Sequence, residues 1–264
     1  MRWSFGPALL AFLLSCSSGG GTGPGARDPV RMSESEYDIA RDLWLRRNQP
    51  REALAHALKA VELDDGNAEA AHLVALLYLD FCSRGPAECR LNEAEKNARL
   101  AMTDKPDFRE AKNTLAVVLI NEKRYVDAIA VLKPLTQDIL YQTPENAWGN
   151  LGWAYLQQGS YDAAIDALKR SVAAQPLFCV GSFRLGLAFE HKQELTSALD
   201  AFTRALETEA PGCNELQDAF AARARVREKL GDLDSARADL DRCVALSGKT
   251  DTGQECSSMR QKFK

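Results

Sequence analysis

Histidine is scarce in this chain of 264 residues, which has three, His56, His72 and His191. They are far apart in the sequence, and none belongs to an H-E-x-x-H motif or a C-x-x-C pair, the patterns that bring metal ligands together. The sequence also lacks a Gly-rich phosphate loop and a G-x-S-x-G nucleophile motif. We therefore expect a protein that is not an enzyme and that uses no metal, no cofactor and no small-molecule substrate.

Basic segments are absent as well. The net charge is −4, from 33 Lys and Arg against 37 Asp and Glu, and the positive residues form no block. Nucleic-acid binding needs a clustered cationic face, so this class of partner is excluded. Strand-like alternation of apolar and polar residues is also missing after Ser33, where the apolar residues recur with a helical period. The sequence thus predicts an all-α protein.

Long apolar runs are missing, because the run Trp3–Leu14 is too short to cross a bilayer comfortably. It follows Arg2, and residues 1–15 are therefore predicted to be an export signal. The signal ends in "LLSC", which resembles a bacterial lipobox with Cys16 at the lipidated position. An ordinary signal peptide with a chance cysteine is the alternative.

The lipobox resemblance implies where the protein is held. Ser17 stands where an Asp would resemble an inner-membrane retention signal, so the outer membrane of a Gram-negative bacterium is the expected location. Cys16 would carry the acyl chains, palmitate among them, and the folded body would lie in the periplasm. Residues 16–33 contain "SSGGGTGPGARDP", which is too rich in Gly, Ser and Pro to form a core, and they are predicted to be a flexible tether.

A 34-residue unit from Glu145 to Phe178 has the sequence pattern of a tetratricopeptide repeat (TPR). Its first helix carries aromatic and aliphatic residues three to four positions apart, and small residues allow close approach of the second helix. The matching residues are Trp148, Leu151, Gly152, Tyr155, Gly159, Tyr161, Ala164 and Pro176. Trp148, Tyr155 and Tyr161 are accordingly expected in the core of the repeat.

The same pattern recurs in register before and after this unit. Six repeats are predicted, at residues 34–67, 68–108, 109–144, 145–178, 179–216 and 217–250, followed by a capping tail at 251–264. The expected fold is a right-handed superhelical solenoid of helix-turn-helix repeats. In the last repeat, Arg223 and Arg227 replace the apolar residues of earlier repeats, which predicts a more hydrated end of the solenoid.

Trp153 is not at a core position of its repeat. It is the ninth residue of the unit, and this position usually lines the concave groove of a TPR superhelix. The central repeats place Leu76, Val117, Trp153 and Leu187 at the ninth position, and Asn113 and Phe183 lie at the fifth. An exposed apolar stripe of this kind needs a partner. The alternative, that these residues pack against neighbouring helices, remains open from the sequence.

Six cysteines follow Cys16, and an even number in an oxidising compartment indicates disulfides. Each repeat of a solenoid contacts only its neighbours, so pairing in sequence order is favoured. The predicted bonds are Cys82–Cys89, Cys179–Cys213 and Cys243–Cys256. A zinc site is the less favoured alternative, because no pair has the close spacing of metal ligands.

One segment carries a more specific resemblance. Residues 122–152, "EKRYVDAIAVLKPLTQDILYQTPENAWGNLG", are similar to the junction of the third and fourth repeats in the PilF/PilW/Tgl family of type IV pilus pilotin lipoproteins. In that family a "Q-D-x-L-Y-P" loop joins the repeats; here Gln137, Asp138, Leu140 and Tyr141 match, and Gln142 replaces the Pro. The six cysteines and the insertion in the second repeat are not part of that pattern.

The resemblance implies a function in binding. A pilotin would bind monomers of the pilus secretin and promote their multimerisation in the outer membrane, and so support pilus biogenesis and twitching-type motility. The alternative is a general periplasmic scaffold, an NlpI-like lipoprotein that recruits envelope-assembly or peptidoglycan enzymes. A carboxylate clamp of the chaperone-binding type is not expected, because its Lys and Asn are missing from the fifth and ninth positions.

Overall fold

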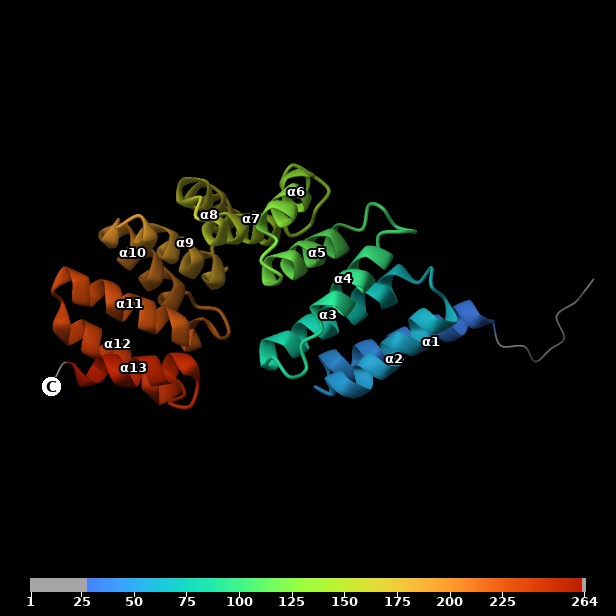
Figure 1. Cartoon of the computed structure of the whole chain (residues 1–264), viewed down its shortest axis with the longest axis horizontal. Helices are drawn as coiled ribbons and strands as arrows, with labels where there is room; N and C mark the ends of the chain where they lie inside the picture. Colours follow the sequence, from blue (N-terminus) through green and yellow to red (C-terminus); the bar gives the residue numbers. More distant parts are fainter. Residues whose placement is uncertain (1–27, 263–264) are drawn as a thin grey trace, which may run out of the picture.

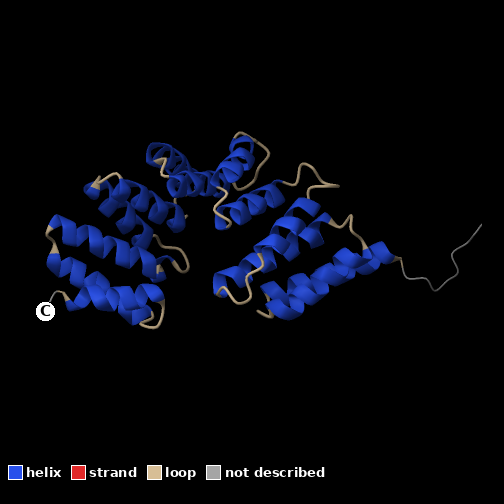
Figure 2. Ribbon diagram, in the orientation of Figure 1, coloured by secondary structure: helices blue, strands red, loops and turns tan. Residues whose placement is uncertain are grey.

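Helix pairs follow one another along the chain in the computed structural model, which describes residues 28–262 (Figure 1). Figure 2 shows helices joined by loops, with no strand in this range. The prediction of an all-α solenoid of TPR repeats is confirmed. The first helices of the repeats are α1 (Pro29–Leu45), α3 (Ala68–Arg84), α5 (Arg109–Asn121), α7 (Pro144–Gln158), α9 (Cys179–His191) and α11 (Gln217–Leu230).

Each first helix packs against a second helix, and the last pair is followed by an additional helix. The second helices are α2 (Pro50–Leu63), α4 (Leu91–Leu100), α6 (Tyr125–Thr136), α8 (Tyr161–Ala174), α10 (Leu195–Glu207) and α12 (Leu233–Leu246); α13 (Asp251–Gln261) comes last. Helix α13 contacts both α11 and α12, so it covers the face that a terminal repeat leaves open. No helix within residues 28–262 is long and apolar enough to cross a membrane.

The turns between paired helices show that the repeats share one register. The fifteenth residue of five repeats has a positive φ: Asn48 (52°), Lys123 (62°), Gly159 (84°), Gln193 (63°) and Gly231 (82°). This left-handed conformation ends a helix and reverses the chain, and glycine adopts it without steric cost. The second repeat differs because a longer connection joins α3 and α4. Turn geometry is thus conserved between repeats even where glycine is not.

Close helix approach explains the small residues at the eighth position. A Cβ built on Gly152 would lie 2.5 Å from Cγ of Leu168, and one on Gly186 would lie 2.5 Å from the ring of Phe202. Both Leu168 and Phe202 come from the second helix of the same repeat and are completely buried. The absence of a side chain on each glycine therefore sets the distance within the helix pair.

The helix pairs curve into an arch, with α5, α7 and α9 on its inner side and α6, α8 and α10 on its outer side (Figure 1). Contacts between repeats agree with this arrangement. Each first helix contacts the first helix of the next repeat, whereas the second helices have no comparable contacts with one another in residues 28–262. The inner layer of a curved stack is the more compressed one, so the first helices form the concave face.

All six cysteines of the described region are paired. The disulfides are Cys82–Cys89, Cys179–Cys213 and Cys243–Cys256, with sequence separations of 7, 34 and 13 residues. These are the pairs that sequence-order pairing favours. The first closes the insertion of the second repeat, the second links α9 to the turn after α10, and the third links α12 to α13. Each bond restricts the unfolded chain, and the third holds the capping helix in place.

The tether predicted over residues 16–33 is wrong for residues 29–33, which form the first turn of α1. Pro29 suits the first position of a helix, and the side chain of Asp28 accepts a hydrogen bond from Val30 N. Ser33 is completely buried, and its hydroxyl donates to Ala60 O at 2.8 Å. The helix therefore starts earlier because these residues pack against α2. Residues 1–27, including Cys16, lie outside the described range.

The prediction of a hydrated last repeat is also wrong. Arg223 is only 8% exposed and donates two hydrogen bonds to Asp239, which is 3% exposed, at 2.9 and 2.7 Å. Arg227 donates to the same carboxylate at 2.7 Å. Arg223 is thus buried and Arg227 partly buried at positions that are apolar in earlier repeats, because one buried aspartate neutralises part of their charge.

Candidate functional site: the concave face

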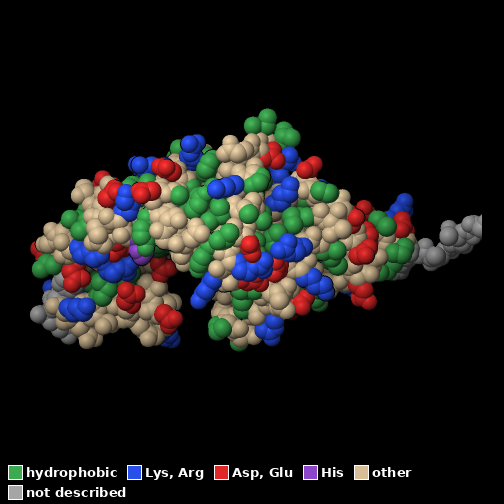
Figure 3. Space-filling model, turned by 45° about the horizontal axis from the view of Figure 1, so that its top comes forward, with side chains coloured by type: hydrophobic (Ala, Val, Ile, Leu, Met, Phe, Trp, Pro, Cys, Tyr) green, Lys and Arg blue, Asp and Glu red, His purple; other side chains and the backbone are tan. Residues whose placement is uncertain are grey.

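The six residues predicted to bind a partner all lie on first helices, which form the concave face. They come from four consecutive repeats and are each half-buried: Leu76 on α3, Asn113 and Val117 on α5, Trp153 on α7, and Phe183 and Leu187 on α9. In Figure 3 the molecule is hollowed at its lower edge, between its N-terminal and C-terminal halves. The concave face therefore carries partly accessible side chains, most of them apolar, from four consecutive repeats.

Trp153 combines packing with exposure. Its ring packs against the core of the third and fourth repeats, and also against the core that α8, α9 and α10 share. Phe183 and Leu187 pack against this second core as well. These side chains therefore pack against adjacent repeats while part of their surface stays accessible, and partner binding by them remains a prediction.

A row of polar side chains runs across the same helices. Asn150 Nδ2 donates to Asn113 Oδ1 at 3.1 Å, and Arg184 Nη1 donates to Asn150 Oδ1, also at 3.1 Å. The row therefore connects α5, α7 and α9. Asn150 and Arg184 are at the sixth position of their repeats, and the sequence reasoning did not select them. Reading the sixth position together with the fifth would have found them, since adjacent residues can share the broad inner surface of a helix.

Arg184 is the most unusual residue of the row. Its guanidinium lies over the ring of Trp153, at 5.1 Å from the ring centroid, which is the geometry of a cation–π interaction. Burial lowers the pKa of Arg184 to about 10, and no neighbouring carboxylate raises it. The side chain therefore remains protonated at neutral pH, although it is half-buried and has no anionic partner among the described residues.

Charged pairs limit the apolar stripe at both ends. In the first repeat, the ninth residue is Asp42, which accepts a hydrogen bond from Arg47 at 2.7 Å. In the last repeat the ninth residue is Arg225, which forms ion pairs with Glu190 at 3.4 Å and Glu255 at 3.5 Å. The apolar surface thus belongs to the four central repeats, as the sequence predicts.

The histidines are far from one another and each has a local contact. His72 is beside Thr114, with 2.8 Å between Nε2 and Oγ1, and burial lowers its pKa to about 4. His56 Nδ1 is 2.5 Å from Glu36, and His191 stacks on Tyr161. No group of three or more metal-binding side chains occurs within residues 28–262.

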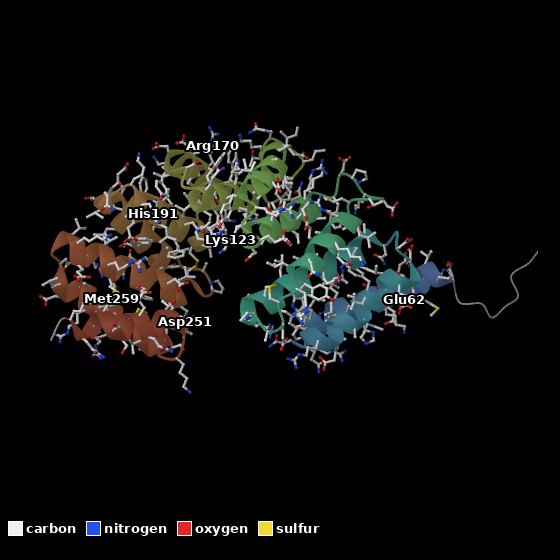
Figure 4. The ribbon with its side chains drawn as sticks, viewed as in Figure 1. Glu62, Lys123, Arg170, His191, Asp251 and Met259 are labelled. Atoms are coloured by element: carbon white, nitrogen blue, oxygen red, sulfur yellow. A yellow bond between two sulfur atoms is a disulfide. The ribbon has the colours of Figure 1, made fainter. Side chains whose placement is uncertain are left out.

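Trp148, expected in the core of its repeat, is only half-buried. It lines a pocket of about 420 Å³ between α6 and α8, together with Tyr155 and Arg170. The guanidinium of Arg170 lies 5.0 Å from the centroid of the Trp148 ring. Figure 4 shows Arg170 at the outer edge of the arch and Lys123, at the end of α5, toward its inner side. Helix α7 therefore carries two comparable Trp–Arg pairs, one on each face.

Within the segment that resembles the pilotin junction, residues 137–143 form the loop between α6 and α7. Asp138 is fixed by Arg109 at 2.7 Å, and its other oxygen accepts from Leu140 N at 2.9 Å. Tyr141 is buried against Leu135 and Ala147. Gln137 is exposed, and Leu140 is 63% exposed. The matching Asp and Tyr thus stabilise the loop, whereas the matching Leu is available on the surface.

Comparison with known proteins agrees with this architecture. Family models of the tetratricopeptide repeat match residues 139–177 and 217–250. The chain is 28% identical over 174 residues to the type IV pilus assembly protein PilF of Pseudomonas aeruginosa, in an alignment that covers 62% of this chain and 65% of that protein. The match thus spans just under two thirds of the curated relative.

Two solved structures extend the likeness to most of the chain. That of PilW, described as a widely conserved type IV pilus biogenesis factor, superposes with a TM-score of 0.71 at 23% identity and covers 84% of this chain and 97% of PilW. That of Pseudomonas aeruginosa PilF gives a TM-score of 0.67 at 17% identity, covering 88% and 100% of the two chains. The protein therefore has a TPR fold, with sequence similarity at low identity to the pilus assembly protein PilF and a fold like that of PilW.

Proposed function

We propose that this TPR protein, a relative of PilF and PilW, is an outer-membrane lipoprotein of the type IV pilus machine that binds secretin monomers and promotes their multimerisation. The relationship to a pilus assembly protein supports the process. The observation that carries the binding role is the half-buried apolar stripe of the central repeats, in particular Trp153. Apolar surface that remains accessible on a folded scaffold is typical of protein–protein contact sites.

The proposed mechanism requires that the protein bind a secretin monomer, and it involves no covalent chemistry. A secretin monomer that leaves the export machinery exposes surfaces that later become subunit interfaces. A rigid concave face could hold one such segment until the monomer reaches the outer membrane, where neighbouring subunits replace the scaffold. Disulfides and the capping helix α13 keep the C-terminal half of the scaffold rigid, which reduces the entropy lost on binding.

Co-purification tests this proposal directly. The native protein is extracted with detergent from outer membranes, captured, and the bound proteins are identified by mass spectrometry. We expect the pilus secretin among them, and we expect a strain without this protein to accumulate secretin monomers in place of the heat-resistant multimers seen on gels. Recovery of peptidoglycan or envelope-assembly enzymes, with normal multimers in the deletion strain, would favour the general scaffold instead.

The lipid anchor gives a separate prediction. We expect Cys16→Ala to leave the folded body intact but to release it from the membrane, since each buried CH₂ contributes ~0.8 kcal/mol and stable attachment takes two acyl chains. The measurement is the distribution of the protein between soluble and membrane fractions after a salt wash. Ser17→Asp is the matched control: this variant should stay membrane-bound but move to the inner membrane. A Cys16→Ala protein that remains in the washed membranes would contradict the lipobox interpretation.

A further inference from the structure

We infer that Arg184, with Trp153 and Asn150, forms a subsite on the concave face that binds a carboxylate of the partner segment. The inference deepens the proposed function and rests on it, because it names the chemistry of the segment that the concave face would hold. The carboxylate is either an Asp or Glu side chain or the C-terminus of the partner chain.

Among the described residues, no carboxylate pairs with Arg184. Other arginines that are buried or partly buried form ion pairs with carboxylates: Arg223 and Arg227 share Asp239, and Arg109 pairs with Asp138. Arg184 donates only to neutral oxygens, Asn150 Oδ1 at 3.1 Å and Gly149 O at 3.3 Å. A half-buried cation has lost part of its hydration, and a ligand that supplies an anion compensates for this loss.

Part of the Arg184 guanidinium is accessible, because the residue is half-buried. Both recorded hydrogen bonds of Arg184 start at Nη1. Among the described residues, the side-chain nitrogens and oxygens that are buried without a partner are Ser182 Oγ and Arg227 Nε. Nε and Nη2 of Arg184 are therefore in contact with solvent. These two nitrogens form one edge of the guanidinium fork, which can bind both oxygens of a carboxylate.

The guanidinium of Arg184 is held in place before any ligand binds. The ring of Trp153 supports the guanidinium, and the amide of Asn150, itself held by Asn113, fixes Nη1. Little side-chain entropy remains to be lost when a ligand binds. Val117 and Leu187 lie at the ninth positions of the flanking repeats and offer apolar surface beside the subsite. The segment that fits is therefore an extended one with an apolar residue close to a carboxylate.

The probes are pools of random-sequence octapeptides, applied to the full-length protein in detergent. One pool has Asp at a fixed central position and its counterpart has Asn there, and each is made with a free or an amidated C-terminus. Binding is measured by fluorescence polarisation. If a side-chain carboxylate is the ligand, we expect the wild type to bind the Asp pool at least about tenfold more tightly than the Asn pool. If the C-terminus is the ligand, we expect the same ratio between the pools with a free and an amidated C-terminus.

Three variants test the role of Arg184. Arg184→Gln should remove the preference for the carboxylate. Asn150→Asp should also remove it, because the new carboxylate neutralises Arg184 within the protein while leaving the arginine in place. Arg170→Gln, which changes the corresponding arginine over Trp148 on the outer face, should leave the preference unchanged. Thermal melts check that each variant is folded.

The outcomes separate this inference from the proposed function, because the pools contain no secretin sequence. Equal binding of acidic and neutral pools by the wild type, or no binding of either, would overturn the carboxylate subsite, and so would an unchanged preference in folded Arg184→Gln. If the carboxylate subsite is overturned but secretin still co-purifies with the protein, the proposed function is still supported. A carboxylate preference that Arg184→Gln and Asn150→Asp both abolish would support the subsite whichever protein co-purifies.

Discussion

Trp153→Ala is expected to abolish the formation of secretin multimers, whereas Trp148→Ala is expected to leave them intact. The two residues lie on the same helix, are both half-buried, and have an arginine at 5.1 and 5.0 Å from the ring centroid, respectively. They differ in the face that they occupy, Trp153 on the concave side and Trp148 in the outer pocket between α6 and α8. The pair therefore separates a loss of binding from a loss of stability.

The expected magnitudes follow from burial. Because neither ring is fully buried, truncation should cost each variant less than the ~3–5 kcal/mol typical of a fully buried aromatic residue, and the two losses should be similar. Aromatic residues at the centre of an interface contribute at least about 2 kcal/mol to binding, which corresponds to roughly thirtyfold in affinity. Leu76, Val117 and Leu187 should show smaller effects in the same direction, since they bury less area.

Two measurements check the prediction: a thermal melt of each purified variant, and the heat-resistant secretin multimer on gels from cells that carry it. Expression levels must be matched, because a less stable protein is degraded faster. If Trp148→Ala removes the multimers at an equal level of folded protein, the outer pocket and not the concave face is the contact site. If both variants retain the multimers, neither tryptophan anchors the partner.

Asp239→Ala is expected to destabilise the last repeat strongly, because it removes a buried carboxylate. The substitution leaves the buried Arg223 and the partly buried Arg227 without a counterion, and removing one partner of a buried ion pair typically costs ~3–5 kcal/mol. In a repeat protein each unit is stabilised mainly by its neighbours, so the loss should be concentrated in the last repeat. Hydrogen exchange should accelerate in α11, α12 and α13 and remain slow in α5–α8.

Two controls make the result specific. Asp241→Ala removes a nearby carboxylate that is 46% exposed and pairs with Arg260, and it should have little effect. The triple variant Arg223→Leu, Arg227→Phe and Asp239→Ala introduces the residue types found at the equivalent positions of the preceding repeat. These residues are Leu185, Phe189 and Ala201. It should recover most of the loss, because apolar replacement of a buried ion network is often neutral or stabilising. Asp239→Ala with wild-type exchange rates would show that the network contributes little.

Much of the fold could be predicted from the sequence, because the determinants of one TPR unit are local. Trp148, Leu151 and Tyr155 lie three to four residues apart, as 3.6 residues per helical turn requires, and the small residues Gly152 and Ala164 mark the two helices of the unit that approach closely. The disulfide pairs follow from the same regularity, since a solenoid brings only neighbouring repeats together. The start of α1 at Pro29 was missed because a Gly- and Pro-rich segment hides the cap formed by Asp28.

The sequence by itself determined which residues each helix turns inward, and hence that Trp153 and the other ninth-position residues share one stripe. Only the tertiary structure decided what lies beside them. The row from Asn113 through Asn150 to Arg184, the burial of Arg223 with Asp239, and the half-exposure of Trp148 all depend on how one helix is rotated and shifted against another. Helical periodicity fixes directions within an element, whereas contacts between elements result from the packing of side chains distant in the sequence, which no local pattern specifies.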